Sequence, residues 1–384
     1  MKTIDLIAGA RPNFMKVAPI LRELRLRQRQ SGGGGLDYRL VHTGQHYDRA
    51  MNSVFFEELG IPAPDVQLAG GGGNHAQQTA RVMTEYDALC QSKRPDCTVV
   101  VGDVDSTLAC SLVAAKLQIP LAHVEAGLRS GDRSMPEEIN RLVVDAVSDI
   151  YFVTEPSGTQ HLLEEGKSRA SIHEVGNLMV DTLFYQRGLT VGECANGPED
   201  SERTLVDQFK KQMAERGLRY AVVTLHRPAN VDDPDRLAGL LQALASLSAQ
   251  IPVVFPVHPR TQRALDQLRL SLGSDVHIFP PLPYMAFLDL WSDAALVLTD
   301  SGGLQEETTA LGVPCLTLRD TTERPVTISN GSNQLAGTEP SQILTLARTI
   351  LARDSSHIFD KPALWDGQAA RRIVDRLRLF LQCE

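Results

Sequence analysis

The sequence predicts an α/β protein with two domains, each built around a parallel sheet. Short apolar runs alternate with longer amphipathic stretches throughout the 384 residues, a pattern typical of βα units. The chain is roughly twice as long as an ordinary domain, so two separate cores are expected. The segment Leu183–Arg203 is mostly polar and contains Gly192, Gly197 and Pro198, which favours a crossing between the domains.

Two series of short apolar runs mark the expected strands. The first series comprises Ile4–Ala8, Arg39–His42, Thr98–Val101, Leu121–Val124, Ile150–Val153 and Ile172–Val175. The second comprises Ala221–Leu225, Val253–Val257, Val276–Phe279, Ala295–Leu298 and Cys315–Leu318. This pattern places the domain boundary near Asp181. Asn74 and Pro136 are expected to start helices, and the amphipathic stretch Ala369–Gln382 predicts a terminal helix.

Charge and composition exclude several classes of protein. The formal net charge of -9 argues against a nucleic-acid partner, which needs a basic surface. From the charged first residues we expect no signal peptide, and no apolar run approaches the roughly 20 residues that span a bilayer. We therefore expect a cytoplasmic protein without a membrane partner. The six cysteines are scattered without a Cys-x-x-Cys pair, which favours reduced thiols over a zinc site.

Three carboxylates stand where the ends of neighbouring strands are expected to meet. Asp103 and Glu125 each follow an apolar strand, and Glu137 follows the proline that opens a helix. In an open α/β sheet, ligands bind in the crevice beyond the carboxyl ends of the strands. Carboxylates that converge there without a metal repel one another, and repulsion with burial raises carboxyl pKa values toward those useful for proton transfer. This segment therefore predicts an enzyme.

Two cations lie just beyond the first strand. Arg11 and Lys16 flank the carboxyl end of this strand, with Pro12 at the point where a helix could begin. Such cations can bind a phosphate or hold catalytic carboxylates ionised. The alternative is that both are ordinary solvated helix charges.

The second half of the chain contains a turn suited to a diphosphate. A strand ends at Asp300, Ser301-Gly302-Gly303 follows, and a helix then begins. The free N–H groups and dipole of a helix start form an anion site, and glycine lets a ligand approach the backbone. Glu307, one turn into this helix, could accept both hydroxyls of a ribose. The alternative is a tight strand–helix turn whose acids only stabilise the helix dipole.

Two histidines follow strands of the second series. His226 precedes Arg227, and His258 lies two residues before Arg260. Histidine suits charge and proton chemistry near neutral pH, although a structural role is the alternative for each. No third histidine or nearby cysteine completes a set of ligands, so no metal is expected.

Together these residues resemble the non-hydrolysing UDP-N-acetylglucosamine 2-epimerases across essentially the whole chain. The matching segments are Gly9-Ala10-Arg11-Pro12 with Lys16, Gly102-Asp103, residues 123–129, residues 136–141, His226-Arg227, residues 300–307 and Thr322-Glu323-Arg324-Pro325. One departure is Asn13-Phe14, which stands where many members have Glu-Ala.

The resemblance implies the glycosyltransferase-B architecture, in which two Rossmann-like domains enclose the active site in a cleft. The last helix is then expected to cross back to the first domain. On this basis the first domain comprises residues 1–180 and 367–384, and the second comprises residues 181–366.

The implied reaction interconverts UDP-N-acetylglucosamine and UDP-N-acetylmannosamine without NAD or a metal. UDP is eliminated, a 2-acetamidoglucal forms, and UDP adds back after protonation of the other face of C2. The resemblance implies that Asp103, Glu125 and Glu137 handle the C2 proton and that His226 assists departure of the diphosphate. The implied substrate contacts are Arg11, Lys16, Arg141, His258, Phe287, Ser301, Gly302, Glu307 and Arg324. A homodimer is also implied.

Four other activities are compatible with this sequence. They are a C2 epimerase of a related UDP-2-acetamido sugar such as a UDP-2,3-diacetamido-uronic acid, a hydrolysing 2-epimerase, a glycosyltransferase of the same architecture, and an inactive nucleotide-sugar sensor. Incubation with UDP-N-acetylglucosamine alone separates the epimerase from a transferase, which needs an acceptor, and from a hydrolysing enzyme, which releases free UDP and N-acetylmannosamine.

Overall fold

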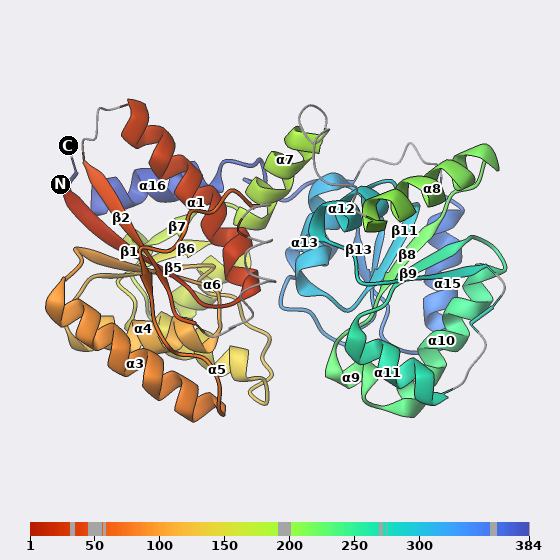
Figure 1. Ribbon diagram of the computed structural model, residues 1–384, viewed down its shortest axis with the longest axis horizontal. Coiled ribbons are helices and arrows are strands. Elements are labelled where there is room, and N and C mark those ends of the chain that lie inside the picture. Colours follow the sequence, from red (N-terminus) through yellow and green to blue (C-terminus); the bar gives the residue numbers. More distant parts are fainter. Residues whose placement is uncertain are drawn as a thin grey trace. The chain divides into compact units, whose positions relative to one another are not determined.

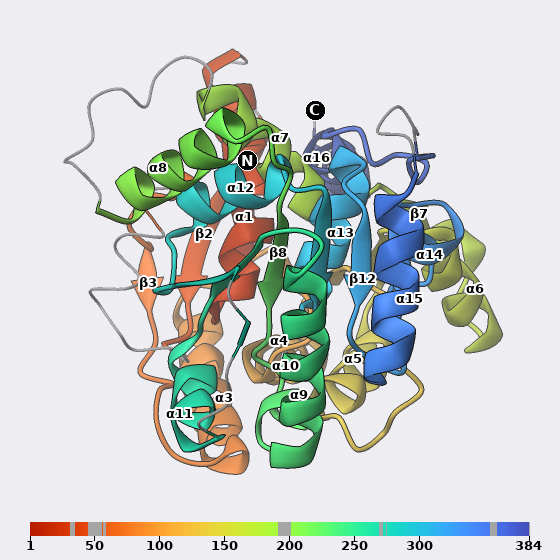
Figure 2. The same cartoon turned by 90° about the vertical axis from the view of Figure 1, so that its right-hand side faces the viewer.

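The computed structural model describes residues 1–30, 35–44, 56, 59–190, 201–268, 272, 273, 275–353 and 359–383, without the side chains of residues 11, 12, 189, 190 and 201. The chain divides into two compact units, residues 1–187 with 363–384 and residues 188–362. Each unit is a parallel sheet with helices on its two faces, as Figures 1 and 2 show. The predicted α/β class with two sheets is therefore confirmed.

The sheet of the first unit has the strand order β3-β2-β1-β4-β5-β6-β7. Its strands are β1 (Lys2–Ala8), β2 (Leu36–His42), β3 (Val66–Gln67), β4 (Cys97–Val101), β5 (Leu121–Val124), β6 (Ile150–Val153) and β7 (Ile172–Glu174). Each predicted run of the first series lies in or overlaps one of these strands. The chain order reverses between β1 and β4, so the ligand crevice of this sheet is expected beside their carboxyl ends.

The sheet of the second unit has the order β10-β9-β8-β11-β12-β13. Its strands are β8 (Ala221–Thr224), β9 (Val253–Pro256), β10 (Val276–Phe279), β11 (Leu296–Thr299), β12 (Cys315–Thr317) and β13 (Asn333–Leu335). The order reverses between β8 and β11. His226 and Asp300 follow these two strands, so both stand at the point where such sheets bind ligands.

Helices cover both faces of each sheet (Figure 1). The helices of the first unit are α1 (Arg11–Gln30), α3 (His75–Ser92), α4 (Asp105–Lys116), α5 (Pro136–Val147), α6 (Pro156–Glu164), the short 3-10 turn η1 (Arg169–Ser171), α7 (Leu178–Thr190) and α16 (Ala369–Phe380). Those of the second are α8 (Ser201–Glu215), α9 (Pro228–Val231), α10 (Pro234–Ser248), α11 (Pro259–Leu268), α12 (Tyr284–Ser292), α13 (Gly302–Leu311), α14 (Val326–Ser329) and α15 (Pro340–Leu351).

Local sequence signals explain where two of these helices begin. Asn74 accepts a hydrogen bond from the Gln77 N–H, and the Gln77 side chain accepts one from the Asn74 N–H. This reciprocal pair is a capping box, and it confirms the helix start predicted at Asn74. Pro136 occupies the first turn of α5, where its missing N–H costs no hydrogen bond, and the predicted start there is also confirmed.

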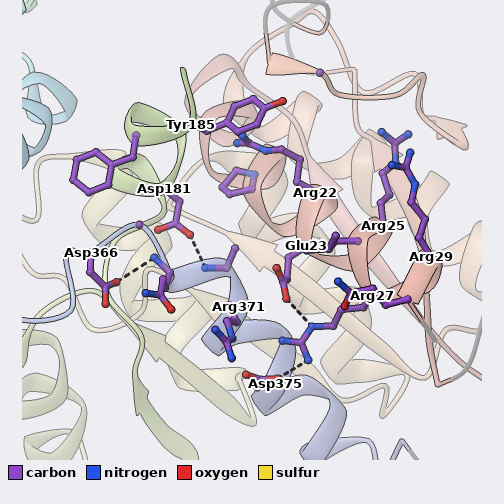
Figure 3. A pocket seen from close by; sticks show the side chains of 18 of the residues that line it. Arg22, Glu23, Arg25, Arg27, Arg29, Asp181, Tyr185, Asp366, Arg371 and Asp375 are labelled. Atoms are coloured by element: carbon purple, nitrogen blue, oxygen red, sulfur yellow. Dashed lines mark hydrogen bonds and ion pairs between the residues drawn. The ribbon is translucent and has the colours of Figure 1, made fainter. Parts of the chain in front are cut away.

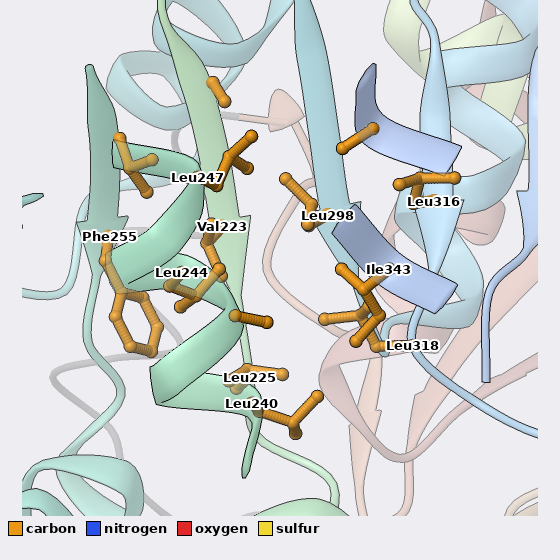
Figure 4. Packing of buried hydrophobic residues seen from close by; sticks show 14 of the residues in the cluster. Val223, Leu225, Leu240, Leu244, Leu247, Phe255, Leu298, Leu316, Leu318 and Ile343 are labelled. Carbon is orange, nitrogen blue, oxygen red and sulfur yellow. The ribbon is translucent and has the colours of Figure 1, made fainter. Parts of the chain in front are cut away.

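The core of the second unit shows why its strands read as short, continuous apolar runs. Val222 and Val223 are adjacent in β8, point to opposite faces of the sheet, and are both fully buried. On one face, Leu240 and Leu244 of α10 and Ile343 of α15 pack with the strand residues (Figure 4). Helices on both faces therefore remove the polar-apolar alternation of a half-exposed strand.

The segment that joins the two units differs from its predicted form. The boundary expected near Asp181 falls inside α7, and the division lies after residue 187. The predicted polar crossing Leu183–Arg203 begins as the end of α7 and ends as the start of α8, while residues 191–200 lie outside the described part of the chain.

The terminal helix belongs to the first unit, as predicted. α16 packs against α1, where Arg27 Nη1 lies 2.5 Å from Asp375 Oδ1 (Figure 3). Asp181 of α7 accepts hydrogen bonds from the Ala369 and Ala370 N–H groups over 3.0 and 2.8 Å. Asp181 therefore caps α16 and joins the segment that leaves the first unit to the segment that returns to it.

Replacing Asp181 by Ala is expected to loosen α16. The substitution leaves two buried N–H groups at the helix start without their acceptor, and losing such a cap costs about 1–2 kcal/mol. Amides of α16 should then exchange with deuterium roughly 5- to 30-fold faster. Peptide-resolved hydrogen exchange measures this, with Asp181→Asn as the control that keeps one acceptor oxygen. Unchanged exchange in Asp181→Ala would show that the cap contributes little.

Candidate active site

The carboxyl edge of the first sheet brings several predicted residues together beside Gly102. A side chain built at Gly102 would place its Cβ 3.4 Å from Glu125 Oε2 and 3.5 Å from Lys16 Nζ. Asp103 comes next in the chain, and its Oδ2 lies 2.5 Å from Arg141 Nη1. Lys16, Asp103, Glu125 and Arg141 therefore surround one glycine turn at the reversal point of the sheet.

Glu125 has the most unusual backbone of these residues. Its φ is +74°, in the left-handed region that non-glycine residues rarely adopt, and its N–H and that of Ala126 both donate to the Phe152 carbonyl. Glu125 is only 6% exposed and forms an ion pair with Lys16. A strained and buried carboxylate persists only where surrounding contacts fix it, and such strain clusters at functional sites.

Arg141 connects Asp103 to a neighbouring loop. Its guanidinium also lies 2.7 Å from Glu138 Oε2, and Glu138 accepts the N–H groups of Ser130 and Gly131. Burial acts to raise the pKa of Glu138, but the Ser130 and Arg141 hydrogen bonds outweigh it and lower the value. Arg141 therefore links Asp103 to Glu138, and the negative charge of Glu138 is already stabilised by these hydrogen bonds.

Glu137 occupies a less buried position at the start of α5. It lies close enough to His75 to contribute to the raised pKa of that histidine, which comes chiefly from the hydrogen bond and charge of Asp105. His75 Nδ1 lies 2.6 Å from Asp105 Oδ2. Sequence reasoning missed His75 and Asp105, although His75 directly follows the helix cap at Asn74. The described contacts do not join Glu137 to Glu125 or Asp103.

A buried network of hydrogen bonds and ion pairs supports the turn at Gly102. His123 Nε2 lies 3.0 Å from the Gly102 carbonyl, and its Nδ1 lies 2.6 Å from Asp145 Oδ1. Arg129 Nη1 lies 2.8 Å from Asp145 Oδ2. Burial acts to raise the pKa of Asp145, but the charges and hydrogen bonds of His123 and Arg129 lower it. His123 and Arg129 therefore have structural partners, and they orient the turn through Asp145.

The loop after β1 is held by the residue that departs from the family pattern. Asn13 Oδ1 accepts the Gly9 and Ala10 N–H groups over 3.2 and 3.0 Å, and its Nδ2 donates to the Val101 carbonyl over 2.8 Å. Asn13 therefore ties the end of β1 to the end of β4. Arg11 begins α1, and its side chain lies outside the described part of the structure.

In the second unit, His226 pairs with the aspartate predicted to end β11. His226 Nδ1 lies 3.0 Å from Asp300 Oδ1, while the fully buried Asp300 also accepts the Arg227 N–H over 2.9 Å. Burial acts to raise the pKa of Asp300, but His226 and these backbone donors lower it. An ionised Asp300 can only accept, so Nδ1 of His226 carries the hydrogen and Nε2 is left for a ligand. The side chain of His226 is 42% exposed.

The start of α13 presents backbone N–H groups beside a buried arginine. Ser301 is the N-cap of α13, but within the described residues its side chain forms no capping hydrogen bond. A Cβ at Gly302 would lie 3.0 Å from Glu323 Oε1 and 3.5 Å from Arg324 Nη1. Arg324 Nε donates to Glu306 Oε1 over 2.5 Å. Ser301, Gly302 and Arg324 therefore lie together in one corner, where backbone N–H groups beside a guanidinium suit an anion.

Glu323 fixes the cations of this corner. Its carboxylate lies 2.9 Å from both Arg324 Nη1 and Arg319 Nη2, and 4.0 Å from Arg227 Nη2. Burial acts to raise the pKa of Glu323, but the charges of Arg324 and Arg319 lower it to about 2. In the sequence, Glu323 was only one residue of a motif that matches the family. In the structure, it brings Arg227 near Arg319 and Arg324, which are distant from Arg227 along the chain.

Glu307 lies within α13 and is almost completely buried. Burial, with a smaller contribution from the charge of Glu306, raises the pKa of Glu307 to about 7 against the hydrogen bond donated by Tyr284. The Tyr284 hydroxyl lies 2.8 Å from Glu307 Oε1. Phe287 lies one turn after Tyr284 on α12 and is half-buried. By contrast, His258 is exposed on the loop before α11, where its Nδ1 accepts the Arg260 N–H over 3.3 Å.

Three further features bear on what the described residues can do. Among them, no three His, Cys, Asp or Glu side chains cluster closely enough to hold a metal ion. The described helices include none with the length and apolar character needed to cross a membrane. A groove of about 1420 Å³ between α1, α7 and α16 contains none of the predicted site residues (Figure 3).

The comparison with known proteins agrees with this geometry. The family model for UDP-N-acetylglucosamine 2-epimerase matches residues 28–378. The UDP-N-acetylglucosamine 2-epimerase of Methanococcus maripaludis is 37% identical over 98% of both chains. The UDP-2,3-diacetamido-2,3-dideoxy-D-glucuronate 2-epimerase of Pseudomonas aeruginosa is 38% identical over 98% of this chain and 99% of its own.

A solved structure extends the likeness to the fold. The UDP-GlcNAc 2-epimerase of Methanocaldococcus jannaschii, in complex with UDP-GlcNAc and UDP, matches with a TM-score of 0.83 and 35% sequence identity. The match covers 98% of this chain and 99% of that chain.

Fold and site together define a nucleotide-sugar enzyme of the two-domain glycosyltransferase-B type. More narrowly, the chain belongs to the UDP-N-acetylglucosamine 2-epimerase family and is an isomerase.

Proposed function

We propose that this enzyme interconverts UDP-N-acetylglucosamine and UDP-N-acetylmannosamine by eliminating UDP and adding it back. The observation that carries the proposal is Glu125, a buried carboxylate with a left-handed backbone that is ion-paired with Lys16 at the reversal point of its sheet. The relatives named for this reaction, 37% identical over nearly the whole chain, support the same conclusion.

The first unit supplies the proton chemistry in this proposal. A carboxylate among Asp103, Glu125 and Glu137 removes the C2 proton, and the electron pair of the C–H bond forms the C1–C2 double bond. A second carboxylate, protonated, can return a proton to the opposite face of C2. The cations Lys16 and Arg141, in contact with Glu125 and Asp103, stabilise the ionised forms.

The second unit supplies the leaving-group chemistry. As the C1–O bond breaks, its electron pair passes to the diphosphate, where negative charge grows. The α13 N-terminus at Gly302 and the Arg324 guanidinium can stabilise that charge. His226, held by Asp300 with Nε2 available, can donate a hydrogen bond or a proton to the diphosphate oxygen. In re-addition the diphosphate oxygen forms the C1–O bond as the second carboxylate gives its proton to the opposite face of C2. The first carboxylate keeps the proton that it removed, so the total number of protons and electrons is unchanged.

Affinity for the UDP-sugar is expected to rise with pH through about 7. In the free protein the pKa of Glu307 is about 7, so the side chain is largely protonated at lower pH. Two ribose hydroxyls donating to Glu307 favour its carboxylate, so binding below pH 7 must release a proton. Affinity should increase by up to about tenfold per pH unit below 7 and level off above it.

Calorimetric titration of UDP-N-acetylglucosamine into an inactive Glu125→Gln variant measures this dependence without turnover. The additional substitution Glu307→Gln should flatten the pH profile, because the amide has no proton to release. A flat profile in the Glu125→Gln protein itself would remove Glu307 from the ribose site.

NMR of the enzyme with UDP-N-acetylglucosamine in deuterated water tests the proposal as a whole. We expect signals of UDP-N-acetylmannosamine to appear and deuterium to enter at C2 in both sugars. Release of free UDP and N-acetylmannosamine would indicate a hydrolysing epimerase instead. An unchanged substrate would point to a transferase or a nucleotide-sugar sensor.

A second candidate substrate follows from one relative. The Pseudomonas aeruginosa enzyme named for UDP-2,3-diacetamido-2,3-dideoxy-D-glucuronate is 38% identical, as similar as the relatives named for UDP-N-acetylglucosamine. Both substrates carry the acetamido group at C2, where the proposed chemistry occurs. The same NMR experiment with each substrate, compared by initial rate, decides between them.

A homodimer in the cytoplasm completes the proposal. The resemblance to the family supports the dimer, and the composition supports the location. Sedimentation equilibrium measures the mass in solution, and a single-chain mass at micromolar concentration would exclude a stable dimer.

A further inference from the structure

A small recess, lined by both polar and apolar side chains, adjoins the Lys16–Glu125 ion pair. Its volume is about 10 Å³, and its polar lining comes from Lys16, Glu125, Thr154 and Asn177. Thr154 follows β6 and Asn177 follows β7, so the recess lies along the same carboxyl edge of the sheet as Glu125. Neither Thr154 nor Asn177 lies in a segment that matches the family pattern.

Two buried polar groups line this recess without a partner. Among the described residues, neither the Thr154 hydroxyl nor the Asn177 Nδ2 has a hydrogen-bond partner. Thr154 is 7% exposed and Asn177 is 3% exposed, so bulk water does not solvate them. Leaving a buried polar group unsatisfied costs about 1–3 kcal/mol, so such groups are normally paired.

Other hydrogen bonds hold the Asn177 amide and the Thr154 backbone. Asn177 Oδ1 accepts the Met179 N–H over 2.9 Å at the start of α7. This bond fixes the amide plane and leaves Nδ2 as a donor in the recess. The Thr154 carbonyl accepts the Trp365 indole N–H over 3.1 Å, which anchors the backbone at Thr154 to the returning segment before α16.

The size and lining of the recess identify its occupant. A cavity of about 10–15 Å³ holds one water molecule, and a buried water needs two to four polar partners. We propose that one water occupies this recess, hydrogen-bonded to Thr154 and Asn177, and that it holds the carboxylate of Glu125 in place beside Lys16. Thr154 and Asn177 are then positioning residues, and this role rests on the proposed function of Glu125.

The consequence for the reaction is specific. A base must hold its oxygen within hydrogen-bonding distance of the proton that it removes, and removing a residue that orients a reacting group typically costs 10- to 100-fold. Loss of the water should therefore lower kcat. It should leave the affinity for UDP unchanged, because the diphosphate corner at Gly302 belongs to the other unit.

Substitutions at two residues test the recess, and each is chosen to preserve the fold. Thr154→Val replaces the hydroxyl by a methyl group of similar size, and Thr154→Ser keeps the hydroxyl. Asn177→Asp keeps an oxygen to cap α7 but replaces the Nδ2 donor by an acceptor close to Glu125. The matched control is Thr309→Val, because Thr309 is also buried with an unpartnered hydroxyl among the described residues, but lies in the second unit.

We expect Thr154→Val and Asn177→Asp to lower kcat by roughly 10- to 100-fold with KM and UDP affinity within about twofold of wild type. Thr154→Ser should restore most of the rate, and Thr309→Val should leave it unchanged. A high-resolution crystal structure of the wild-type protein should contain the water, and that of Thr154→Val should lack it. Wild-type kcat in Thr154→Val, or an empty recess in the wild-type crystal, would overturn the inference. Failure of the wild-type enzyme to epimerise would instead overturn the proposed function, since the crystal result does not depend on turnover.

Discussion

Glu125→Gln is expected to lower turnover by about 10²- to 10⁴-fold while leaving the affinity for UDP within about twofold. The amide cannot accept a proton from C2, and it no longer balances the charge of Lys16. Because Gln has nearly the same shape, the left-handed backbone and the contacts around it should persist. A coupled assay of epimerisation measures the rate, and calorimetry with UDP measures the affinity.

The same experiment on Asp103 and Glu137 separates the roles of the three acids. We expect Asp103→Asn and Glu137→Gln to reduce turnover within the same range, since each is proposed to handle a proton. Glu23→Gln on α1 is the matched control, because Glu23 is also ion-paired in this unit, with Arg27, but lies away from Gly102. Near-normal activity in any one of the three variants would remove that residue from the mechanism.

Glu137 is the residue for which this test matters most. The structure places Lys16, Asp103, Glu125 and Arg141 around one turn, but it relates Glu137 to His75 instead. If Glu137→Gln retains activity while Asp103→Asn and Glu125→Gln do not, two carboxylates suffice for removal and return of the C2 proton. His75 would then be the next candidate for substitution.

Most of the fold could be predicted because buried parallel strands leave a strong local pattern. A central strand such as β8, with Val222 and Val223 buried on opposite faces, reads as a continuous apolar run. The strands that were missed, β3 at Val66–Gln67 and β13 at Asn333–Leu335, lie at sheet edges and are too short to show any period. Their pairing is decided by the neighbouring strand rather than by their own residues.

The candidate site likewise has a part that could be predicted from the sequence and a part that could not. Residues that follow strands, such as Asp103, Glu125 and Asp300, could be placed from the sequence because strand ends of a parallel sheet share one edge. Contacts between distant segments could not be placed. The Asp145 partner of His123 lies on α5, and Glu323 lies near Arg227, which follows β8. No local pattern encodes such pairs, and the backbone strain at Glu125 is visible only in three dimensions.

Gly302→Val is expected to weaken UDP binding by roughly 100-fold or more, about 2.8 kcal/mol. Gly302 is the first residue of α13, and in the proposed function its backbone faces a phosphate, so glycine is needed there for close approach. A Cβ at this position would lie 3.0 Å from Glu323 Oε1 and 3.5 Å from Arg324 Nη1. The larger valine side chain therefore both occupies the phosphate position and pushes apart the ion pair that orients Arg324.

The control for this effect is Gly239→Ala on α10, where a new Cβ would meet only Pro340 at an ordinary 3.5 Å. That variant should bind UDP normally, since α10 packs on the core rather than at the strand ends. Calorimetric titration of UDP gives the affinities, and a melting curve of each variant verifies that the second unit is folded. A folded Gly302→Val protein with wild-type affinity would exclude the α13 N-terminus as the diphosphate site. The leaving-group chemistry would then have to rest on His226 and on arginines elsewhere in the second unit, and the division of labour between the two sheets would lose its main support.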